Sequence, residues 1–507
     1  MTQYDNRKIA KNTLYMYLRM LVTMVVSLFT TRIVFRALGV DNYGIYNVVG
    51  SVIVFFTFIN NGLTTASRRY ITAELAQGDS ESQRNVFNLA VLAHVLISGI
   101  VLFLAETIGL WVVNSLLNIP EDRMFAANVV YQLSVFSAIL SVMQAPFTAA
   151  ITANERMNIY AYLSILDVIL KLALAYVVMV APGDKLIIYA ICVFVVGVLN
   201  IIINRLYCYK VFPMCRFKRP NNKALLKEMF GYMGWNLTGQ GMVVLTNQGV
   251  TLLVNMFFTV AANAAMGISN QITGIVSHFV SNFQVAFNPQ ITKLYVSRNQ
   301  SDLIKLANRC SRLSSYLVLV FVIPLCFQVR NFLFLWLGEY PEYAVEFCVI
   351  TLVAILIDSL SAPLWMILSA DKNVKKYQIV ISSIYAMNFV GSWIVLKLGF
   401  PPYSVIIVRV IVYCVAIAAR LMLVKEKIAV FPIIQWLREV PLRTVSVAFI
   451  PIASCFLIGL LNINSQLLEL LIKGGLAFFV SCLAVFFIGM TKSERSFILE
   501  KVLKRNK

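Results

Sequence analysis

The stretch LIIYAICVFVVGVLNIIINRLY, residues 186–207, decides the fold class, because it stays apolar for long enough to cross a lipid bilayer. A transmembrane helix needs about twenty predominantly apolar residues, since backbone groups cannot stay unpaired in hydrocarbon. Similar runs recur along the chain and predict an all-α polytopic membrane protein with about fourteen spans. The spans are expected at 13–38, 44–66, 87–113, 124–152, 160–181, 186–207, 229–257, 264–288, 310–335, 343–370, 378–398, 402–424, 442–462 and 467–490.

The composition also favours a membrane protein. Of the 507 residues, 60% are hydrophobic and 13% are charged, whereas soluble domains are roughly half apolar and a quarter charged. The net charge of +20 lies mostly in short segments between the apolar runs, where it orients a membrane protein, so nucleic acid is not an expected partner. The nine cysteines are scattered, and we interpret them as small hydrophobic residues.

Lys and Arg concentrate in alternate connections between the predicted spans. Cytoplasmic loops are enriched in these residues. With the N-terminus inside, the basic segments 205–227, 293–312 and 425–443 all become cytoplasmic. We therefore expect a multi-pass protein with both termini in the cytoplasm.

The span pattern repeats at an offset of about 220 positions. Six spans separate the copies, so they share one topology and predict two six-helix lobes in parallel repeat, followed by two extra helices. The expected division is an N-terminal lobe at 1–208, a basic cytoplasmic linker at 209–228, a C-terminal lobe at 229–424, and two further helices with a basic tail at 425–507. Transporters with two such lobes typically enclose a central cavity and work by alternating access.

Two prolines occupy matched positions in the repeats, Pro146 and Pro363. Proline removes a helix hydrogen bond and crowds the preceding turn. We interpret the pair as hinges, with ordinary helix irregularity as the alternative.

The segment RALGVDNYGIY at 36–46, followed by NNGL at 60–63 and RRY at 68–70, resembles polysaccharide repeat-unit (O-antigen or capsule, Wzx-type) flippases of the MOP superfamily, which also holds MATE drug exporters and lipid II flippases. The resemblance implies two lobes around a cavity. It also implies transfer of an undecaprenyl-pyrophosphate-linked oligosaccharide from the inner to the outer leaflet of the bacterial cytoplasmic (inner) membrane. The implied partners are this polyprenyl-pyrophosphate-linked glycan and membrane lipids, with a polysaccharide polymerase or other assembly protein left open.

Charged residues inside predicted spans are costly and normally face a cavity or a partner. Arg19, Arg32 and Arg36 lie on the first span, and we expect them to form one cationic stripe. Guanidinium groups bind phosphate oxygens in bidentate fashion. Arg19 and Arg32 are therefore candidate substrate-binding residues, with snorkelling of Arg36 and Arg32 to the interface as the alternative.

Four further intramembrane charges are candidates for the cavity. Asp167 and Lys171 are spaced i, i+4, which favours a neutralising pair on one helix face but leaves a ligand role open. Asp358 and Arg409 belong to the second lobe. They could pair across that lobe or face the cavity.

Polar uncharged residues mark the third, seventh and eighth spans. The two histidines are His94 and His278; either could carry a coupling proton or form an ordinary interhelical hydrogen bond. Amides, among them Asn247 and Asn270, suit sugar hydroxyls but also join helices. We include His278, Asn247 and Asn270 in the predicted binding set.

The sequence shows no nucleotide-binding loop, metal cluster or nucleophile motif, so we predict neither an enzyme nor a bound cofactor. Coupling to H⁺, Na⁺ or the membrane potential stays open. A membrane-embedded glycosyltransferase or polymerase is the rival from the enzyme class. The transporter rival is a MATE-like ion-coupled multidrug exporter, whose cavity we would expect to be acidic, whereas these spans hold more Arg and Lys than Asp and Glu.

Overall fold

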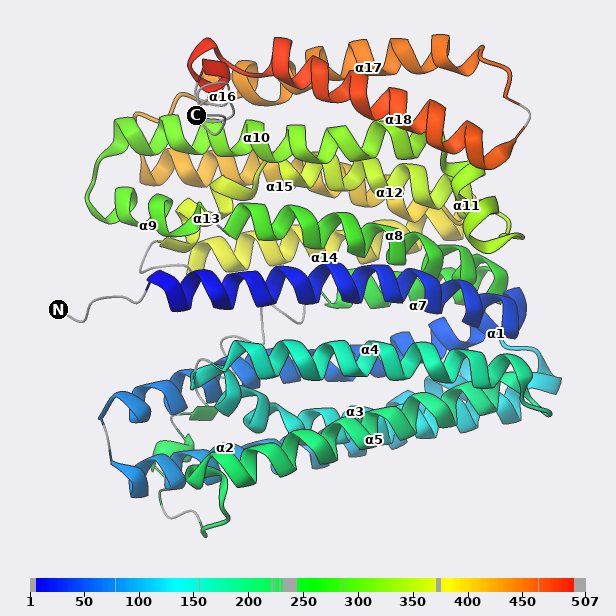
Figure 1. Cartoon of the computed structure of the whole chain (residues 1–507), viewed down its shortest axis with the longest axis vertical. Helices are drawn as coiled ribbons and strands as arrows, with labels where there is room; N and C mark the ends of the chain where they lie inside the picture. Colours follow the sequence, from blue (N-terminus) through cyan, green and yellow to red (C-terminus); the bar gives the residue numbers. More distant parts are fainter. Residues whose placement is uncertain are drawn as a thin grey trace. The chain divides into compact units, whose positions relative to one another are not determined.

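The chain is described here by a computed structural model, and every regular element in its described ranges is a helix (Figure 1). The described residues are 6–77, 79–154, 156–219, 222, 224–227, 229–230, 244–285, 287–370, 375–463 and 465–496. The predicted all-α polytopic fold class is confirmed.

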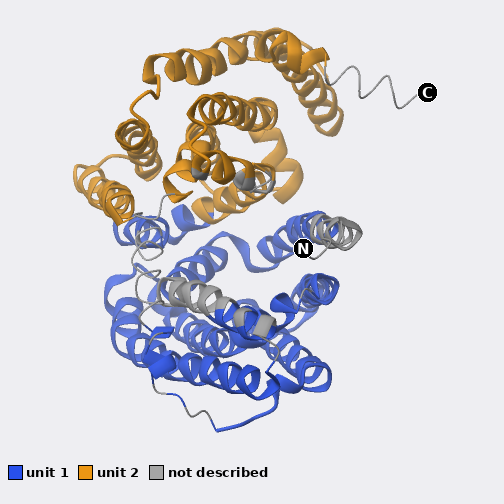
Figure 2. Cartoon of the chain, turned by 90° about the vertical axis from the view of Figure 1, so that its left-hand side faces the viewer, with its two compact units in different colours: residues 1–264 blue, residues 265–507 orange. Residues whose placement is uncertain are grey.

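The chain forms two compact units, residues 1–264 and 265–507 (Figure 2). The predicted four-part division at 1–208, 209–228, 229–424 and 425–507 stays a prediction. The elements of the first unit are α1 (Asn6–Gln77), α2 (Ser80–Leu104), the π-helical turns η1 (Ala105–Gly109) and η2 (Val112–Leu116), η3 (Glu121–Arg123), α3 (Met124–Ala153), α4 (Met157–Val180), α5 (Lys185–Val211), η4 (Pro213–Cys215), η5 (Leu245–Gly249) and α7 (Val250–Phe257).

Helix α8 (Val260–Val285) begins in the first unit and continues in the second. The remaining elements of the second unit are α9 (Asn288–Val296), α10 (Gln300–Phe327), α11 (Val329–Leu337), α12 (Ala344–Ser359), α13 (Ala362–Ala370), α14 (Lys375–Lys397), α15 (Ser404–Lys427), α16 (Ile433–Leu437), η6 (Arg438–Leu442), α17 (Arg443–Gly459), α18 (Gln466–Ala484) and η7 (Val485–Gly489).

Ten helices in the described ranges are long and apolar enough to cross a membrane, and α12 with α13 adds an eleventh if this bent pair is one span. The predicted count of about fourteen is therefore not confirmed. Helix α1 counts once although it carries two predicted spans, and α8 is too rich in amides to qualify. Most of the predicted span 229–257, namely residues 231–243, lies outside the described residues.

Helix α1 bends at Gly39, where the backbone takes φ 76° and ψ 175°. Only glycine adopts this conformation without strain. A T-shaped contact between Phe35 and Tyr43, with ring centroids 5.3 Å apart, joins the two arms across the bend. The bend therefore separates the two predicted spans 13–38 and 44–66.

Gly44 lets the second arm of α1 approach the backbone at Val260. A Cβ built at Gly44 would overlap the Val260 carbonyl oxygen and lie 2.7 Å from the carbonyl carbon. Both glycines belong to the segment RALGVDNYGIY, so this segment shapes the first unit.

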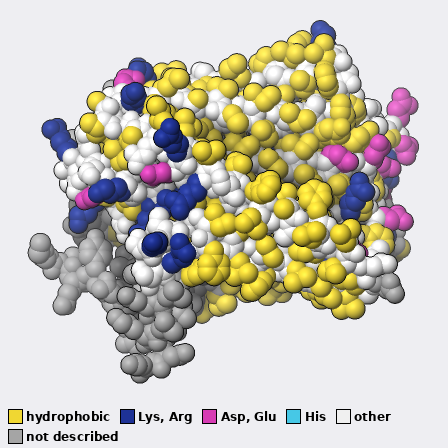
Figure 3. All heavy atoms as spheres, turned by 90° about the horizontal axis from the view of Figure 1, so that it is seen from above, with side chains coloured by type: hydrophobic (Ala, Val, Ile, Leu, Met, Phe, Trp, Pro, Cys, Tyr) yellow, Lys and Arg dark blue, Asp and Glu magenta, His cyan; other side chains and the backbone are white. Residues whose placement is uncertain are grey.

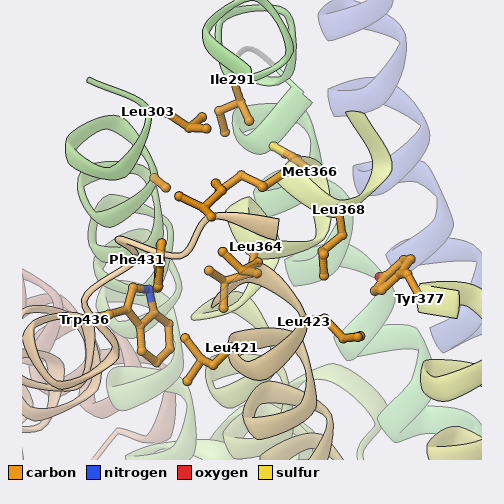
Figure 4. Close-up of a cluster of buried hydrophobic side chains, with 14 of the residues drawn as sticks. Ile291, Leu303, Leu364, Met366, Leu368, Tyr377, Leu421, Leu423, Phe431 and Trp436 are labelled. Carbon is orange, nitrogen blue, oxygen red and sulfur yellow. The ribbon is translucent and has the colours of Figure 1, made fainter. Parts of the chain in front are cut away.

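Each unit has its own apolar core. In the first unit, Ile71, Phe87, Ile151 and Met214 are buried where α1, α2, α3 and η4 come together. In the second unit, a larger cluster joins α9, α10, α13, α15 and α16 around Leu364 and Trp436 (Figure 4). Trp436 is fully buried.

The last two long helices, α17 and α18, pack against α10 within the second unit. The Tyr316 hydroxyl donates a hydrogen bond to the Gly489 carbonyl over 3.1 Å. The Tyr316 ring also occupies the space that a Cβ at Gly489 would need. These contacts fix the C-terminal hairpin, formed by α17 and α18, to α10 of the second unit.

One face of the molecule shows the expected membrane pattern (Figure 3). Hydrophobic side chains cover its middle, most Lys and Arg gather toward one end, and most Asp and Glu gather toward the other. This distribution agrees with spans whose two ends meet water on opposite sides of a bilayer.

Candidate functional site

Arg19 lies in the first arm of α1 against α4. Its guanidinium carbon is 5.0 Å from the centroid of the Tyr160 ring, a cation–π distance. Its Nε is buried and has no hydrogen-bond partner among the described residues. Arg19 therefore lies against an aromatic ring in the first turn of α4, with no carboxylate beside it in the described part of the chain.

The predicted single stripe of Arg19, Arg32 and Arg36 is wrong. Thirteen residues separate Arg19 from Arg32, which places them about 140° apart around the helix axis at 3.6 residues per turn. Arg32 is half-buried and Arg36 is exposed. These two arginines share the face of α1 that also exposes Val25 and Phe29, while Arg19 points toward α4. The first arm thus carries cations on two faces.

Asp167 and Lys171 form an ion pair on α4, with Lys171 Nζ 2.7 Å from Asp167 Oδ2. The Lys171 side chain is 41% exposed and that of Asp167 is 22% exposed. The neutralising pair expected from the i, i+4 spacing is present. A ligand role for these two residues stays a prediction.

Asp358 pairs with an arginine that the sequence analysis overlooked. Arg420 Nη1 lies 3.5 Å from Asp358 Oδ1, and the Arg420 side chain is 7% exposed. Arg420 also donates hydrogen bonds to the Ser361 hydroxyl and, over 2.7 Å, to the Tyr385 hydroxyl. Arg420 could have been predicted as an intramembrane charge, because it lies within the predicted span 402–424.

Arg409, the other predicted cation of the second lobe, lies on α15 and is buried. Its Nε has no hydrogen-bond partner in the part of the chain that the structure describes. Asp358 therefore pairs with Arg420 and not with Arg409. Arg409 has no carboxylate partner among the described residues.

The remaining predicted binding residues are exposed: Asn247 in η5 and Asn270 and His278 on α8. Asn270 and the exposed Ser277 lie two turns apart on one face of α8. Exposed amide and hydroxyl groups on an embedded helix are poorly matched to lipid tails. This face of α8 is chemically suited to water or to a polar ligand.

The two predicted hinge prolines differ in their surroundings. Pro146 lies inside α3, which continues as one helix from Met124 to Ala153. Pro363 is the second residue of α13, directly after a break at which α12 and α13 are bent by 44°. Their hinge roles stay predictions.

Polar contacts outside the spans hold the connections in place. Asp184 accepts hydrogen bonds from Leu186 N and Ile187 N at the start of α5 and pairs with Arg123 over 2.7 and 3.0 Å. The Arg123 hydrogen bonds keep the pKa of Asp184 below its usual value. Within the described ranges, no group of three or more His, Cys, Asp or Glu residues could hold a metal ion.

Comparison with known proteins places the chain in a family. The model of the polysaccharide biosynthesis protein family matches residues 9–294, more than half of the chain. The chain belongs to this family. A Bacillus subtilis (strain 168) protein described as uncharacterized membrane protein EpsK is 20% identical over 371 residues, which cover 73% of each chain.

Solved structures show the fold of this polysaccharide biosynthesis protein. The lipid II flippase MurJ, in an inward closed conformation, is similar with a TM-score of 0.68 at 11% identity, over 93% of this chain and 98% of that one. An inward-facing multidrug resistance MATE family transporter of the MOP superfamily is similar with a TM-score of 0.64 at 13% identity, over 83% of this chain and 98% of that one. The predicted family is confirmed as the polysaccharide biosynthesis protein family, and the fold is similar to that of a lipid II flippase and of a transporter of the MOP superfamily. These neighbours are transporters and a flippase rather than enzymes.

Proposed function

We propose that this polysaccharide biosynthesis protein is a flippase for undecaprenyl-pyrophosphate-linked oligosaccharide repeat units, which it moves from the inner to the outer leaflet by alternating access. The observation that carries the proposal is the family match combined with a fold similar to that of a lipid II flippase. The bacterial cytoplasmic membrane, with both termini on the cytoplasmic side, is part of the proposal.

The charges within the spans support an anionic substrate. Arg19 and Arg409 lie on helices that are long and apolar enough to cross a membrane, and neither has a carboxylate partner among the residues described. A charge in that position costs a few kcal/mol unless a counter-charge or water compensates it. A pyrophosphate passing through would supply the counter-charge, and its oxygens fit the planar donor set of arginine.

The exposed polar groups support a sugar-bearing substrate. Asn247, Asn270 and His278 are exposed on η5 and α8, and amides can both donate hydrogen bonds to sugar hydroxyls and accept them. In this proposal Arg19 contacts the pyrophosphate and the amides contact the glycan. Rocking about the bend at Pro363 would change which leaflet the site faces.

A genetic test follows directly. Deletion of the gene is expected to trap lipid-linked repeat units on the cytoplasmic leaflet and to abolish the surface polysaccharide, and the plasmid-borne gene should restore both. Normal surface polysaccharide in a deletion strain that has no paralogue would overturn the proposal.

The similarity to a MATE family transporter favours a second candidate, an ion-coupled exporter of organic cations. That function predicts drug sensitivity on deletion and cation efflux in vesicles. Within the described spans, Asp167 and Asp358 are paired with cations, whereas Arg19 and Arg409 have no carboxylate partner. This surplus of positive charge argues against a cationic substrate. Efflux of a cationic drug by the purified chain would favour the exporter instead.

A further inference from the structure

A cavity of about 490 Å³ lies at the end of the first unit where α2 begins and α5 ends. It is formed where the start of α2 faces η4 and the basic residues that follow it. The lining residues are Leu75, Ser80, Glu81, Gln83, Arg84, Asn154, Phe212, Pro213, Met214, Arg216 and Lys218.

The lining of this cavity is predominantly cationic. It carries Arg84, Arg216 and Lys218 against a single acid, Glu81. Lys218 is paired with Glu81, so the charges of Arg84 and Arg216 are left in excess. A ligand that enters the cavity therefore meets a net positive field, which favours an anion.

The wall that carries these cations is fixed to α2. Arg84 donates from Nε to the Arg216 carbonyl over 3.1 Å and from Nη2 to the Phe217 carbonyl over 2.5 Å. The buried Asn88 amide donates to the same Arg216 carbonyl over 3.2 Å. These bonds satisfy backbone oxygens of the connection, and the Arg216 side chain is exposed.

An exposed aromatic residue stands between two of the lining cations. Phe217 is 77% exposed and is flanked by Arg216 and Lys218. It follows the end of α5, whose residues Tyr209 and Val211 are also exposed. Aromatic residues beside Lys and Arg at the end of a membrane span are typical of the interface between lipid tails and headgroups.

We propose that this cavity binds the phosphate of an anionic glycerophospholipid, with Arg84, Arg216 and Lys218 around the headgroup and Phe217 inserted among the acyl chains. Basic pockets at the ends of transmembrane helices have the charge and depth to recognise such headgroups. The exposed Phe217 ring favours a lipid over a soluble phosphate, because acyl chains would cover this ring and inorganic phosphate would not. The site is separate from the residues proposed to contact the transported glycan.

The experiment is native mass spectrometry of the full-length chain in a neutral detergent, with phosphatidylglycerol or phosphatidylcholine added. The test variant is R216Q/K218Q, and the matched control is K210Q, which removes an exposed cation from the last turn of α5 outside the cavity. Each cation near an anionic headgroup is worth about fivefold in affinity, so the double variant should lose about 30-fold in phosphatidylglycerol binding. K210Q and the wild type should bind alike, and phosphatidylcholine should bind weakly to all three.

A second variant, F217A, keeps all the cations and should weaken phosphatidylglycerol binding while leaving the melting temperature unchanged. Inorganic phosphate is added as the soluble competitor and should fail to displace the lipid. Equal phosphatidylglycerol binding by R216Q/K218Q and K210Q would overturn the proposal. So would full displacement by inorganic phosphate, or an F217A variant that binds lipid like the wild type.

Discussion

The ion pair between Arg312 and Glu494 offers a test of how the C-terminal hairpin is held. Arg312 Nη2 lies 2.8 Å from Glu494 Oε1, and both side chains are only 7% exposed. The Thr491 N–H donates to the other carboxylate oxygen over 2.8 Å. The pair joins α10 to the residues directly after η7, so the variant E494Q removes the charge while nearly keeping the shape.

The loss of stability in E494Q depends on the burial of Arg312, the partner that remains. Removing one member of a buried ion pair costs about 3–5 kcal/mol, because the other charge is left uncompensated. The pair between Lys376 and Glu426 is 59% and 50% exposed, and exposed pairs contribute about 0–1 kcal/mol. E426Q is therefore the matched control, and the two variants should differ by about 2–5 kcal/mol.

The effect should also depend on pH. Burial alone would raise the pKa of Glu494, but the Thr491 hydrogen bonds and the Arg312 charge outweigh it and hold the pKa below its usual value. A carboxyl with a lowered folded-state pKa contributes stability that is present above its unfolded pKa, about 4.3. That contribution is lost as the pH falls through the folded value, so E494Q and the wild type should converge in acid.

The assay is reversible unfolding of the full-length chain in mixed micelles, followed by hydrogen exchange of α17 and α18. E494Q should speed exchange in this hairpin, and E426Q should not. The reasoning fails if the two variants lose the same free energy of unfolding at neutral pH, or if E494Q leaves the exchange of the hairpin unchanged.

Three further predictions concern the first unit. Gly44→Ala should lower the thermal stability of the purified chain or abolish folding, because its Cβ would overlap the Val260 carbonyl; stability equal to that of the open-site control Gly50→Ala would contradict the close approach. Gly39→Ala should cost about 1–3 kcal/mol in the free energy of unfolding from backbone strain alone, since nothing lies within 4 Å of its added Cβ; no loss of stability would mean that the bend does not need a positive φ. Asp184→Asn keeps a residue suited to start α5 but loses the Arg123 charge pair, so it should cost about 1 kcal/mol at neutral pH. Since the pKa of Asp184 is lowered, this difference should vanish in acid, and a difference that persists in unfolding measurements at low pH would refute the pairing.

The positions of several membrane-spanning helices could be predicted from the sequence. The length of an apolar run reports directly on a helix that must satisfy its backbone in lipid, so α3, α4 and α5 lie close to the predicted 124–152, 160–181 and 186–207. Gly39 and Gly44 belong to the segment that carries the family resemblance, but the bend and the close approach that they allow depend on packing that the sequence does not show.

The candidate site was less accessible from sequence, because pairing across helices depends on packing. The i, i+4 pair of Asp167 and Lys171 was readable from one helix. The partner of Asp358 comes from α15, 62 positions away in sequence, and nothing local distinguished Arg420 from Arg409. The single arginine stripe is wrong because 13 residues of α-helix leave Arg19 and Arg32 about 140° apart around the axis.

The central claim, that the chain flips a pyrophosphate-linked glycan, is tested most directly by transbilayer movement in reconstituted vesicles. Purified protein is inserted into vesicles whose lumen-facing leaflet carries a lipid-linked oligosaccharide, and exposure of the glycan is followed with an external glycosidase. The wild type should expose the glycan, and R19A should slow exposure at least about tenfold, since a hydrogen bond to a charged group contributes about 1.5–3 kcal/mol. No exposure by a folded wild-type protein, or an R19A variant as fast as the wild type, would contradict the account.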